Sequence, residues 1–480
     1  MTRWVMPFVA ALILTGCAAG PDYVRPQLAE VPAWQASLPW QLGEPADEQP
    51  KGEWWTVFGD AELNALQRQA LDANQNLQLA AARLAQARAG ARAAEAGRWP
   101  TLDLNARGVR QKTSANRPGS SYDSQSTSTV QNDFSLLAAV GYEVDLFGRV
   151  AREIEAANAN RSQAEADAEN VRLLVTAEVA GSWFSLRALD AELDVLRRGL
   201  AFQQRAVDVL QARYEEGTAS GLELAQQQAQ REATLTQFDL AERQRKLLEH
   251  ALATLIGTPA PLFRQPPRPF SLDGPVAVPT LPLGVPATLL QRRPDIAAAE
   301  RQVAAANALI GVASAARFPS LRLSAIGGWD SNELSSLVSA PSVLWSLGAG
   351  LAYSVVDGGR NAARVDAAQA QHQGASAQYR LTVLRAMQEV EDSAASLVAY
   401  DQARQHAGAA TVSAERALAI ATDRYRGGVA SYLEVVTASQ AALNNRRQLA
   451  QLYGQQLVST VQLIRALGGG WQPPAEIAAN

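Results

Sequence analysis

The sequence predicts an α+β membrane protein whose body is an internal duplication. Three observations support this fold class: a twelve-residue motif occurs twice at a spacing of 211 residues, four segments of about ten residues alternate apolar and polar side chains, and long proline-free stretches lie between these segments and the motifs. Four transmembrane β-strands per chain cannot close a barrel, so we expect three chains to share a twelve-stranded trimeric β-barrel. The long stretches predict a periplasmic α-helical barrel of coiled-coil hairpins that continues it.

Composition excludes several function classes. The 480 residues carry a net charge of −4 and show no basic stripe, which argues against nucleic-acid binding. Three histidines and one cysteine leave no disulfide within the chain and argue against a Cys/His metal site. The sequence shows no nucleophile elbow, phosphate loop or triad pattern, so we do not expect an enzyme, and we expect no cofactor.

The N-terminus has the features of a lipoprotein signal peptide, which we assign to residues 1–16. The apolar run Val5–Leu14 is too short to span a bilayer. It ends in Leu14-Thr15-Gly16-Cys17, which is typical of a bacterial lipobox, and Cys17 is the only cysteine. We therefore predict a covalent lipid, such as palmitate, on Cys17. Ala18 follows in place of an aspartate, which favours the outer membrane as the destination.

Residues 17–60 are rich in proline and read as an extended, lipidated strap. The pair Trp54–Trp55 is expected to pack the strap onto a surface. Two structural repeats follow, at 61–258 and 287–470, joined by a Pro-rich link at 259–286 and followed by a tail at 471–480.

Each repeat is predicted to contain, in this order, a helix, two strands, a long helix, a tip and a return helix. The first long helix, about 149–212, would measure on the order of 95 Å, and a return helix follows at about 222–256. The second long helix covers about 360–423, with a return helix at about 433–467. A heptad seam in the first long helix predicts supercoiling against a partner helix. Its members are Leu186, Leu189, Leu193, Leu196, Leu200, Gln203, Val207, Leu210 and Tyr214.

The strands are predicted at about 101–110, 134–146, 320–329 and 345–356. Their two-residue period is the signature of a transmembrane β-strand. Aromatic residues near the strand ends suggest an interfacial girdle. They are Trp99, Phe147, Phe318 and Trp329. Alternation of this kind also occurs in half-buried strands of soluble sheets, but four strands between such long helices would have no sheet core to join.

The repeated motif forms two predicted tips, at 213–222 and 424–433. In each tip we expect a glycine to end the long helix and a serine to cap the return helix. One interpretation is a pair of ordinary turns between helices. The other is an exposed docking or gating surface.

The chain resembles the TolC-like outer-membrane channels, and most closely their lipoprotein branch, which serves resistance–nodulation–division (RND) efflux systems. The resemblance extends over nearly the whole mature chain. It is carried by the lipobox, Gly20–Pro26, Trp54–Trp55 with Phe58 and Asp60, Leu289–Ile296 with Glu300, and the doubled tip.

The resemblance implies a homotrimeric, passive conduit in the bacterial outer membrane that extends into the periplasm and exports small molecules. It also implies two protein partners, a periplasmic adaptor (membrane-fusion protein) and an inner-membrane RND transporter, which together open the conduit. By this resemblance the tips dock the adaptor. The residues concerned are Arg213, Tyr214, Gly217, Ser220 and Leu222 in the first tip, and Arg424, Tyr425, Gly428, Ser431 and Leu433 in the second.

TolC itself carries an aspartate pair just after the second tip, at its periplasmic constriction. Here the corresponding positions are Glu434 and Thr437, and Glu223 is the first-repeat equivalent of Glu434. We take Glu223 and Glu434 as the candidate periplasmic gate. The alternative is that both glutamates only favour a helix N-terminus through its dipole.

Two rival functions belong to other classes. The first is an enzyme, but no motif in the sequence supports a catalytic function. A periplasmic coiled-coil scaffold without a pore would explain the helices but would leave the four alternating strands unexplained. The sequence therefore favours the outer-membrane channel of a tripartite efflux pump.

Overall fold

The computed structural model describes residues 19–26, 52–112, 114, 130–272 and 293–469. These residues fall into two compact units. The strand unit lies within Met1–Gln27, Ala85–Gln163 and Ala299–Tyr379, and the hairpin unit lies within Leu28–Leu84, Ala164–Ala298 and Arg380–Asn480. Both units draw on both sequence repeats, so the duplication is not a division into two folded domains.

Within the described residues, no helix combines the length and apolar character needed to cross a membrane.

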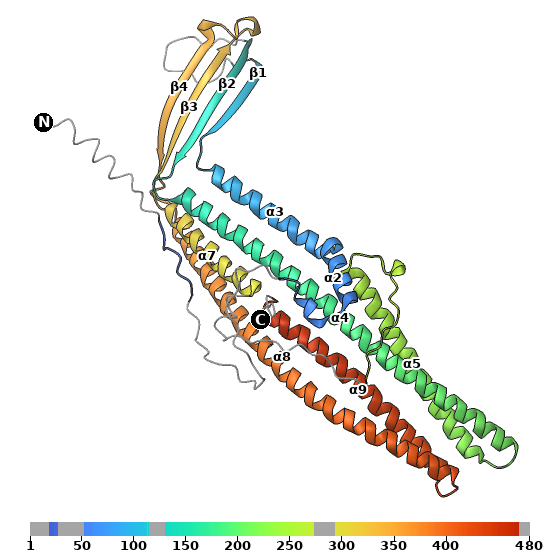
Figure 1. Cartoon of the computed structure of the whole chain (residues 1–480). Coiled ribbons are helices and arrows are strands. Elements are labelled where there is room, and N and C mark those ends of the chain that lie inside the picture. The colour runs from blue at the N-terminus through green and yellow to red at the C-terminus, as the bar shows by residue number, and fades with distance from the viewer. Residues whose placement is uncertain (1–18, 27–51, 113, 115–129, 273–292, 470–480) are drawn as a thin grey trace, which may run out of the picture. The chain divides into compact units, whose positions relative to one another are not determined.

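The strand unit contains one antiparallel sheet in the order β1-β2-β3-β4 (Figure 1). Its strands are β1 (Thr101–Lys112), β2 (Val130–Val144), β3 (Ser320–Ser331) and β4 (Val343–Ala352). Two strands come from each repeat, and β2 pairs with β3 across the repeats. Short 3-10 turns, η3 (Leu334–Ser336) and η4 (Ala340–Ser342), lie between β3 and β4.

The pairing register places most of the apolar positions of the four strands on one face. Leu102 lies opposite Val140, Val140 opposite Ala325, and Ala325 opposite Leu347. Because side chains alternate along a strand, the other face collects mainly polar and small residues, together with Val109, Leu137, Ile326 and Leu344. Leu104 and Leu347 of the apolar face are each 76% exposed in the single chain. An exposed apolar face of this kind is what lipid-facing strands require.

Aromatic side chains lie at both ends of the sheet. At one end the rings of Phe147 and Phe318 stack with their centroids 4.6 Å apart, and Trp99 lies two residues before the start of β1. At the other end Trp329 and Trp345 lie in neighbouring strands, within two residues of the edge of the β3–β4 ladder. This distribution agrees with the predicted interfacial girdle.

Two strand boundaries differ from the sequence prediction by four residues, and the others agree with it within two. β2 begins at Val130 and not at 134, because β1 continues to Lys112 and pairs with it there. The polar residues 131–133 conceal this extension. β4 ends at Ala352 and not at 356, because its last partner, Ser320, is the first residue of β3. The length of each strand therefore depends on how far the neighbouring strand extends to pair with it.

The strap segment 19–26 is fixed on the parts of two helices, α4 (Arg149–Glu215) and α7 (Pro294–Ala315), that belong to the strand unit. Arg152 of α4 donates to Asp22 at 2.7 Å. Tyr23 donates to Glu300 of α7 at 2.8 Å, and burial, followed by this hydrogen bond, raises the pKa of the Tyr23 phenol. Asn307 of α7 donates to the carbonyl of Pro21 at 3.0 Å.

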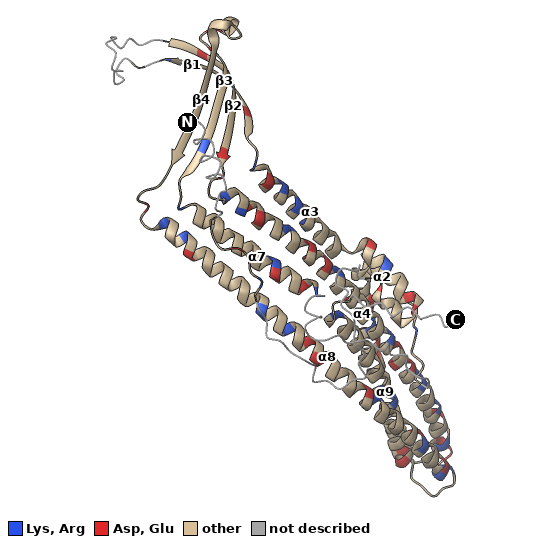
Figure 2. Ribbon diagram, turned by 60° about the vertical axis from the view of Figure 1, so that its left-hand side comes forward, with Lys and Arg blue, Asp and Glu red and all other residues tan. Residues whose placement is uncertain are grey.

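The hairpin unit is formed mainly by two helical hairpins. The first pairs α4 with α5 (Gly221–Leu255), and the second pairs α8 (Arg360–Arg426) with α9 (Tyr432–Ala466). Each long helix contains 67 residues and runs three residues beyond its predicted end. The heptad seam of α4 is buried or half-buried except at Tyr214, which is consistent with the predicted coiled-coil packing. Acidic and basic residues are spread along the helices (Figure 2).

The core of the hairpin unit surrounds η1 (Trp54–Phe58) and α2 (Ala61–Ala73), which precede α3 (Gln75–Ala96). Trp54 and Trp55 are both buried, and Trp54 Nε1 donates to Thr176 of α4 at 3.2 Å. The prediction that this pair packs the chain onto a surface is confirmed. After α5, the short turn η2 (Ala260–Leu262) begins the link.

A polar cluster around one buried carboxylate, Glu192, joins the two hairpins. Arg447 of α9 donates to Glu192 of α4 through two nitrogens, and Gln451 donates to the same carboxylate at 3.0 Å. Glu192 is buried, so these hydrogen bonds replace the contacts with water that its carboxylate loses on burial. Arg447 also contacts Gln237 of α5 at 2.8 Å.

Candidate docking tips and gate

In both tips, the long helix ends in the same backbone geometry. In the first tip, Gly217 has a φ of +74°, its N–H donates to the carbonyl of Tyr214, and the next N–H donates to the carbonyl of Arg213. In the second tip, Gly428 has a φ of +73° and makes the equivalent bond to Tyr425. This pattern is a Schellman motif, which favours glycine because of its left-handed conformation. The predicted role of both glycines is confirmed.

The two return helices begin differently. Ser220 accepts from the N–H of Leu222 at 3.1 Å, and Glu223 accepts from the N–H of Ser220 at 3.2 Å, which completes a capping box. Ser431 has a similar extended backbone, but its side chain makes no capping hydrogen bond. The predicted serine cap is therefore correct for the first tip and wrong for the second. A hydroxyl caps a helix only when its rotamer points to the free N–H groups, and sequence does not specify that rotamer.

An aromatic contact closes each tip, but with different partners. In the first tip, the Tyr214 ring covers Gly221, and a methyl group added there would lie 3.3 Å from the ring. In the second tip, position 221 corresponds to Tyr432, and the rings of Tyr425 and Tyr432 meet edge to face at 5.1 Å. The second tip therefore has a larger aromatic core.

Tyr432 also joins the two hairpins. Its hydroxyl donates to Oε1 of Gln227 on α5 at 2.9 Å. A cluster of buried side chains surrounds this contact and draws on both hairpins: Leu210, Leu224, Ala421, Tyr432 and Val435. Burial, followed by the nearby Tyr425 and Glu223, raises the pKa of Tyr432 to about 12. The phenol is therefore neutral and able to donate at any physiological pH.

Most of the predicted docking residues are accessible in this chain. The exposed residues are Arg213, Tyr214, Gly217, Ser220, Leu222, Arg424, Gly428, Ser431 and Leu433. Tyr425 is half-buried because its ring packs against Tyr432. Sequence reasoning overlooked Tyr432 and Gln227. The available signal for Tyr432 was that the second tip carries a tyrosine at the position where the first tip carries Gly221.

Both candidate gate glutamates have partners within their own tips. Glu223 is half-buried and completes the capping box. Glu434 is exposed and lies 3.4 Å from the guanidinium of Arg424. The two glutamates thus lie at equivalent positions but in different electrostatic surroundings.

The predicted lipidation residue, Cys17, lies outside the described residues. The nearest described residue, Ala19, donates its N–H to the carbonyl of Phe147 at 2.9 Å. In the described part of the chain, no group of three or more His, Cys, Asp or Glu residues could hold a metal ion.

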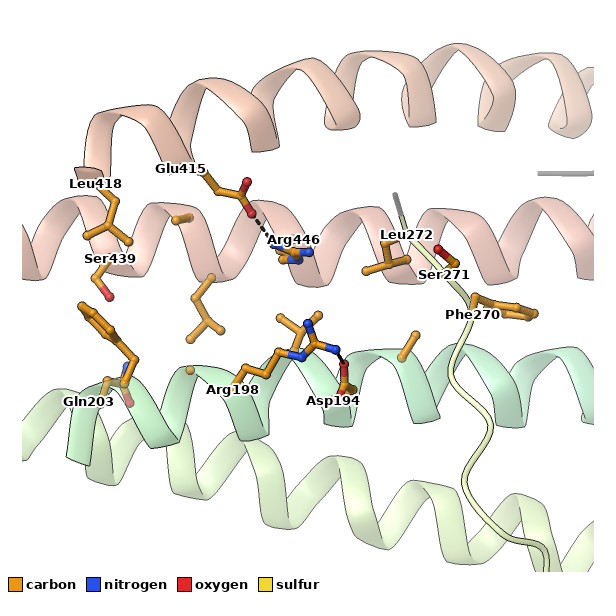
Figure 3. Close-up of a pocket in the computed structure, with 16 residues that line it drawn as sticks. Asp194, Arg198, Gln203, Phe270, Ser271, Leu272, Glu415, Leu418, Ser439 and Arg446 are labelled. Atoms are coloured by element: carbon orange, nitrogen blue, oxygen red, sulfur yellow. Dashed lines mark hydrogen bonds and ion pairs between the residues drawn. The ribbon is translucent and has the colours of Figure 1, made fainter. Parts of the chain in front are cut away.

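A cavity of about 300 Å³ lies between the two hairpins and residues 270–272 (Figure 3). Arg198 pairs with Asp194 at 2.8 Å, and Arg446 pairs with Glu415, so the charged groups of the cavity are balanced. Its lining includes Ser271 and Ser439 but no histidine or cysteine that could activate them. We therefore interpret this cavity as a gap between packed helices and not as a reactive site.

Comparison with known proteins identifies the family. A family model described as "Outer membrane efflux protein" matches residues 66–258 and 285–469. The cation efflux system protein CusC of Escherichia coli O6:H1 is 32% identical, over 98% of this chain and 99% of that protein. The pyoverdine export outer membrane protein OpmQ of Pseudomonas aeruginosa is 31% identical, over 96% of each chain.

The solved structure of the outer-membrane channel OprN superposes with a TM-score of 0.86 at 29% sequence identity, and the match covers 95% of this chain and all of that one. This likeness confirms the predicted fold class, a TolC-like trimeric channel with long helices and a small β-sheet. The family consists of passive channels and not of enzymes. The chain therefore belongs to the outer membrane efflux protein family.

Proposed function

We propose that this chain forms the outer-membrane duct of a tripartite RND efflux pump, as a homotrimer that a periplasmic adaptor and an inner-membrane pump open. The observation that carries the proposal is the combination, in one chain, of a sheet with one continuous apolar face and two matched helical tips. The apolar face suits a barrel wall in lipid, and the tips offer repeated sites for a partner.

The sheet needs other chains to complete it. Its edge strands, β1 and β4, would present unpaired N–H and C=O groups to lipid, which costs several kcal/mol for each group. Pairing of the β1 edge of one copy with the β4 edge of the next removes this cost. Closure by three copies, each with four strands, would give a barrel of twelve strands.

We also infer that a lipid on Cys17 anchors the chain to the outer membrane. Ala19 lies two residues after this cysteine, and its N–H is fixed to the carbonyl of Phe147, between β2 and α4. The anchor would therefore lie beside the aromatic stack of Phe147 and Phe318. Lipid and aromatic side chains would then mark the same membrane surface.

The tips suit an adaptor for a physical reason. Each exposes an apolar side chain on a rigid, glycine-ended turn: Leu222 in the first and Leu433 in the second, both more than half exposed. A preorganised surface loses little entropy on binding. An adaptor that binds an open arrangement of the tips more tightly would shift the channel towards it.

Glu223 and Glu434 are our candidates for the periplasmic gate. Carboxylates that converge from three chains repel one another, attract cations and raise the barrier to anions. The ion pair between Arg424 and Glu434 would weaken this field in the resting state. Opening would change the field if it separated the two groups.

We assign the choice of cargo to the pump and not to the duct. One relative, CusC, is named for cation efflux and another, OpmQ, for pyoverdine export, yet both match this chain almost equally well. A passive conduit that serves such different cargo would discriminate little between molecules by their chemical nature.

Deletion of the gene in its native host tests the function. We expect the deletion strain to become sensitive to a set of toxic compounds and to regain resistance with the wild-type gene. Outer-membrane extracts should contain heat-modifiable trimers of the chain. Recovery of the chain as a soluble periplasmic monomer, with no change in sensitivity, would refute the proposal.

A further inference from the structure

Two positively charged side chains lie at one end of the apolar face of the sheet. On β1 this face consists of Leu102, Leu104 and every second residue after them, because the pairing of β1 with β2 is continuous and side chains alternate along a strand. By this register Arg110 and Lys112 belong to the same face, and both are exposed. They lie near the end of β1, whereas Leu102 lies near its start.

Among the described strand residues, no other charged side chain belongs to this face. The pairing register assigns to it the even-numbered residues of β2 and the odd-numbered residues of β3 and β4, all of them uncharged. The remaining charged residues of the strands lie on the opposite face. They are Asp103, Arg107, Asp133, Glu143, Arg322 and Asp330. The charge of the apolar face is therefore entirely positive and is confined to one end of one strand.

Neither cation has a carboxylate partner in the part of the chain that the structure describes. No described carboxylate lies within 4.0 Å of Arg110 or Lys112, and the residues opposite them on β2 are the uncharged Asn132 and Val130. By contrast, Arg107 on the other face has a carboxylate at 4.0 Å. A charge on a surface that faces lipid is costly unless an opposite charge or water meets it. The two cations therefore call for an anionic partner from the membrane side.

Aromatic residues indicate the level of the membrane at which the cations lie. Phe134 of the same face pairs with Gly108, two residues before Arg110, and Trp345 near the start of β4 is 75% exposed. Such rings collect at the level of the lipid headgroups. Arg110 lies about 27 Å along the strand from Leu102, and the outward apolar band of a barrel is about 25 Å tall. The cations would thus lie at the headgroups of the outer leaflet, which long side chains can reach.

We propose that Arg110 and Lys112 form a binding site for an outer-leaflet lipid that carries two phosphate groups. This proposal rests on the proposed function, because it takes the apolar face to lie in the outer membrane. Guanidinium and ammonium groups make strong, charge-assisted hydrogen bonds to phosphate oxygens. The two residues lie roughly 7 Å apart along one side of the strand, so each can meet a different phosphate of one lipid.

The position of the site on an edge strand sets its number in the assembly. β1 is at one edge of the sheet, and pairing of this edge with another copy would use backbone groups and leave both side chains facing lipid. A trimer would therefore offer three equivalent sites, one beside each junction between copies.

Native mass spectrometry of the full-length trimer tests the proposal with three lipid probes. The first is lipid A, which carries two phosphates. The second is dephosphorylated lipid A, which keeps the same acyl chains, and the third is phosphatidylglycerol, which carries one phosphate. We expect up to three lipid A molecules to bind each trimer and the other two lipids to bind more weakly. Arg110→Gln with Lys112→Gln should weaken lipid A binding about 30-fold, since each cation contributes about fivefold, and should leave binding of the dephosphorylated form unchanged.

Two further variants keep the test specific. Arg107→Gln removes a cation from the same strand but from the opposite face, so it should not change lipid A binding. The exchange of Arg110→Lys with Lys112→Arg keeps both charges and should bind lipid A more tightly than the double glutamine variant. Equally weak binding by these two double variants would overturn the proposal, because charge would then not hold the lipid.

Equal binding of lipid A and its dephosphorylated form to the wild-type trimer would also overturn the proposal, because the phosphates would make no difference. Equal binding of phosphatidylglycerol would overturn the choice of a lipid with two phosphates. An equal loss in the Arg107 variant would assign the effect to overall charge and not to this site. The proposed function would survive all of these results as long as the gene still restored resistance in the deletion strain.

Discussion

Tyr432 of α9 donates its hydroxyl to Oε1 of Gln227 of α5 at 2.9 Å, and so joins the two hairpins of one chain beside their tips. The bond spans 205 residues of sequence, and both side chains are buried. Gln227 in turn donates to the backbone carbonyl of Gln203 of α4. The hairpins therefore cannot separate here without loss of the buried hydrogen bond between Tyr432 and Gln227, whose amide is held on α4 by its own bond to Gln203.

Replacement of Tyr432 by phenylalanine should favour an open channel. The variant keeps the ring contact with Tyr425 but leaves a buried amide oxygen without its donor, at a cost of about 1–3 kcal/mol. We expect higher resting conductance of purified trimers in planar bilayers. In the double-mutant cycle, Tyr432→Phe and Gln227→Leu together should cost less than the sum of the two single changes. Additive effects would mean that the bond does not hold the hairpins together.

The glycines of the tips allow a test that separates docking from folding. Gly217 and Gly428 have positive φ, yet a Cβ added at either would meet no atom within 4 Å. Alanine there therefore costs about 1–2 kcal/mol of backbone strain without a clash. A bulky residue, such as tryptophan, would also cover the proposed docking surface. We expect Gly217→Trp and Gly428→Trp to form trimers but to fail to restore resistance.

Gly427→Ala is the matched control for this experiment. Gly427 directly precedes Gly428 but is not among the glycines with positive φ, and an added Cβ would make only ordinary contacts with the carbonyls of the preceding turn. We expect full export from this variant. Loss of trimers in the tryptophan variants would assign the tips a structural role only.

Replacement of Glu434 by glutamine should alter ion passage. The change removes a carboxylate that would be repeated three times around the mouth, and it releases Arg424 from its ion pair. We expect weaker block by divalent cations and a shift of selectivity towards anions in planar bilayers. Asp239→Asn on α5 removes an exposed carboxylate away from the tip and serves as the control. Unchanged block and selectivity would exclude Glu434 from the gate.

The sequence predicted those features of the fold that depend on local pattern. Two-residue alternation located all four strands, and the repeated glycine located both tips. The start of β2 was missed because Gln131, Asn132 and Asp133 look like a loop, although pairing with β1 makes them a strand. The link between Tyr432 and Gln227 was missed because it depends on how two distant hairpins pack together.

A close contact between two glycines is expected to hold residues 19–26 of the strap against α4 and α7. Gly20 and Gly311 meet so closely that a Cβ on Gly311 would lie 2.7 Å from Cγ of Arg152 and 2.8 Å from the carbonyl oxygen of Ala19. Gly311→Val should therefore displace the strap from α4 and α7 and make residues 19–26 sensitive to protease in purified trimers. Gly90→Ala on α3 is the control, because its added methyl group meets no atom within 4 Å, and alanine favours a helix by about 1 kcal/mol over glycine. Equal protection of the strap in both variants would show that the glycine contact does not hold it.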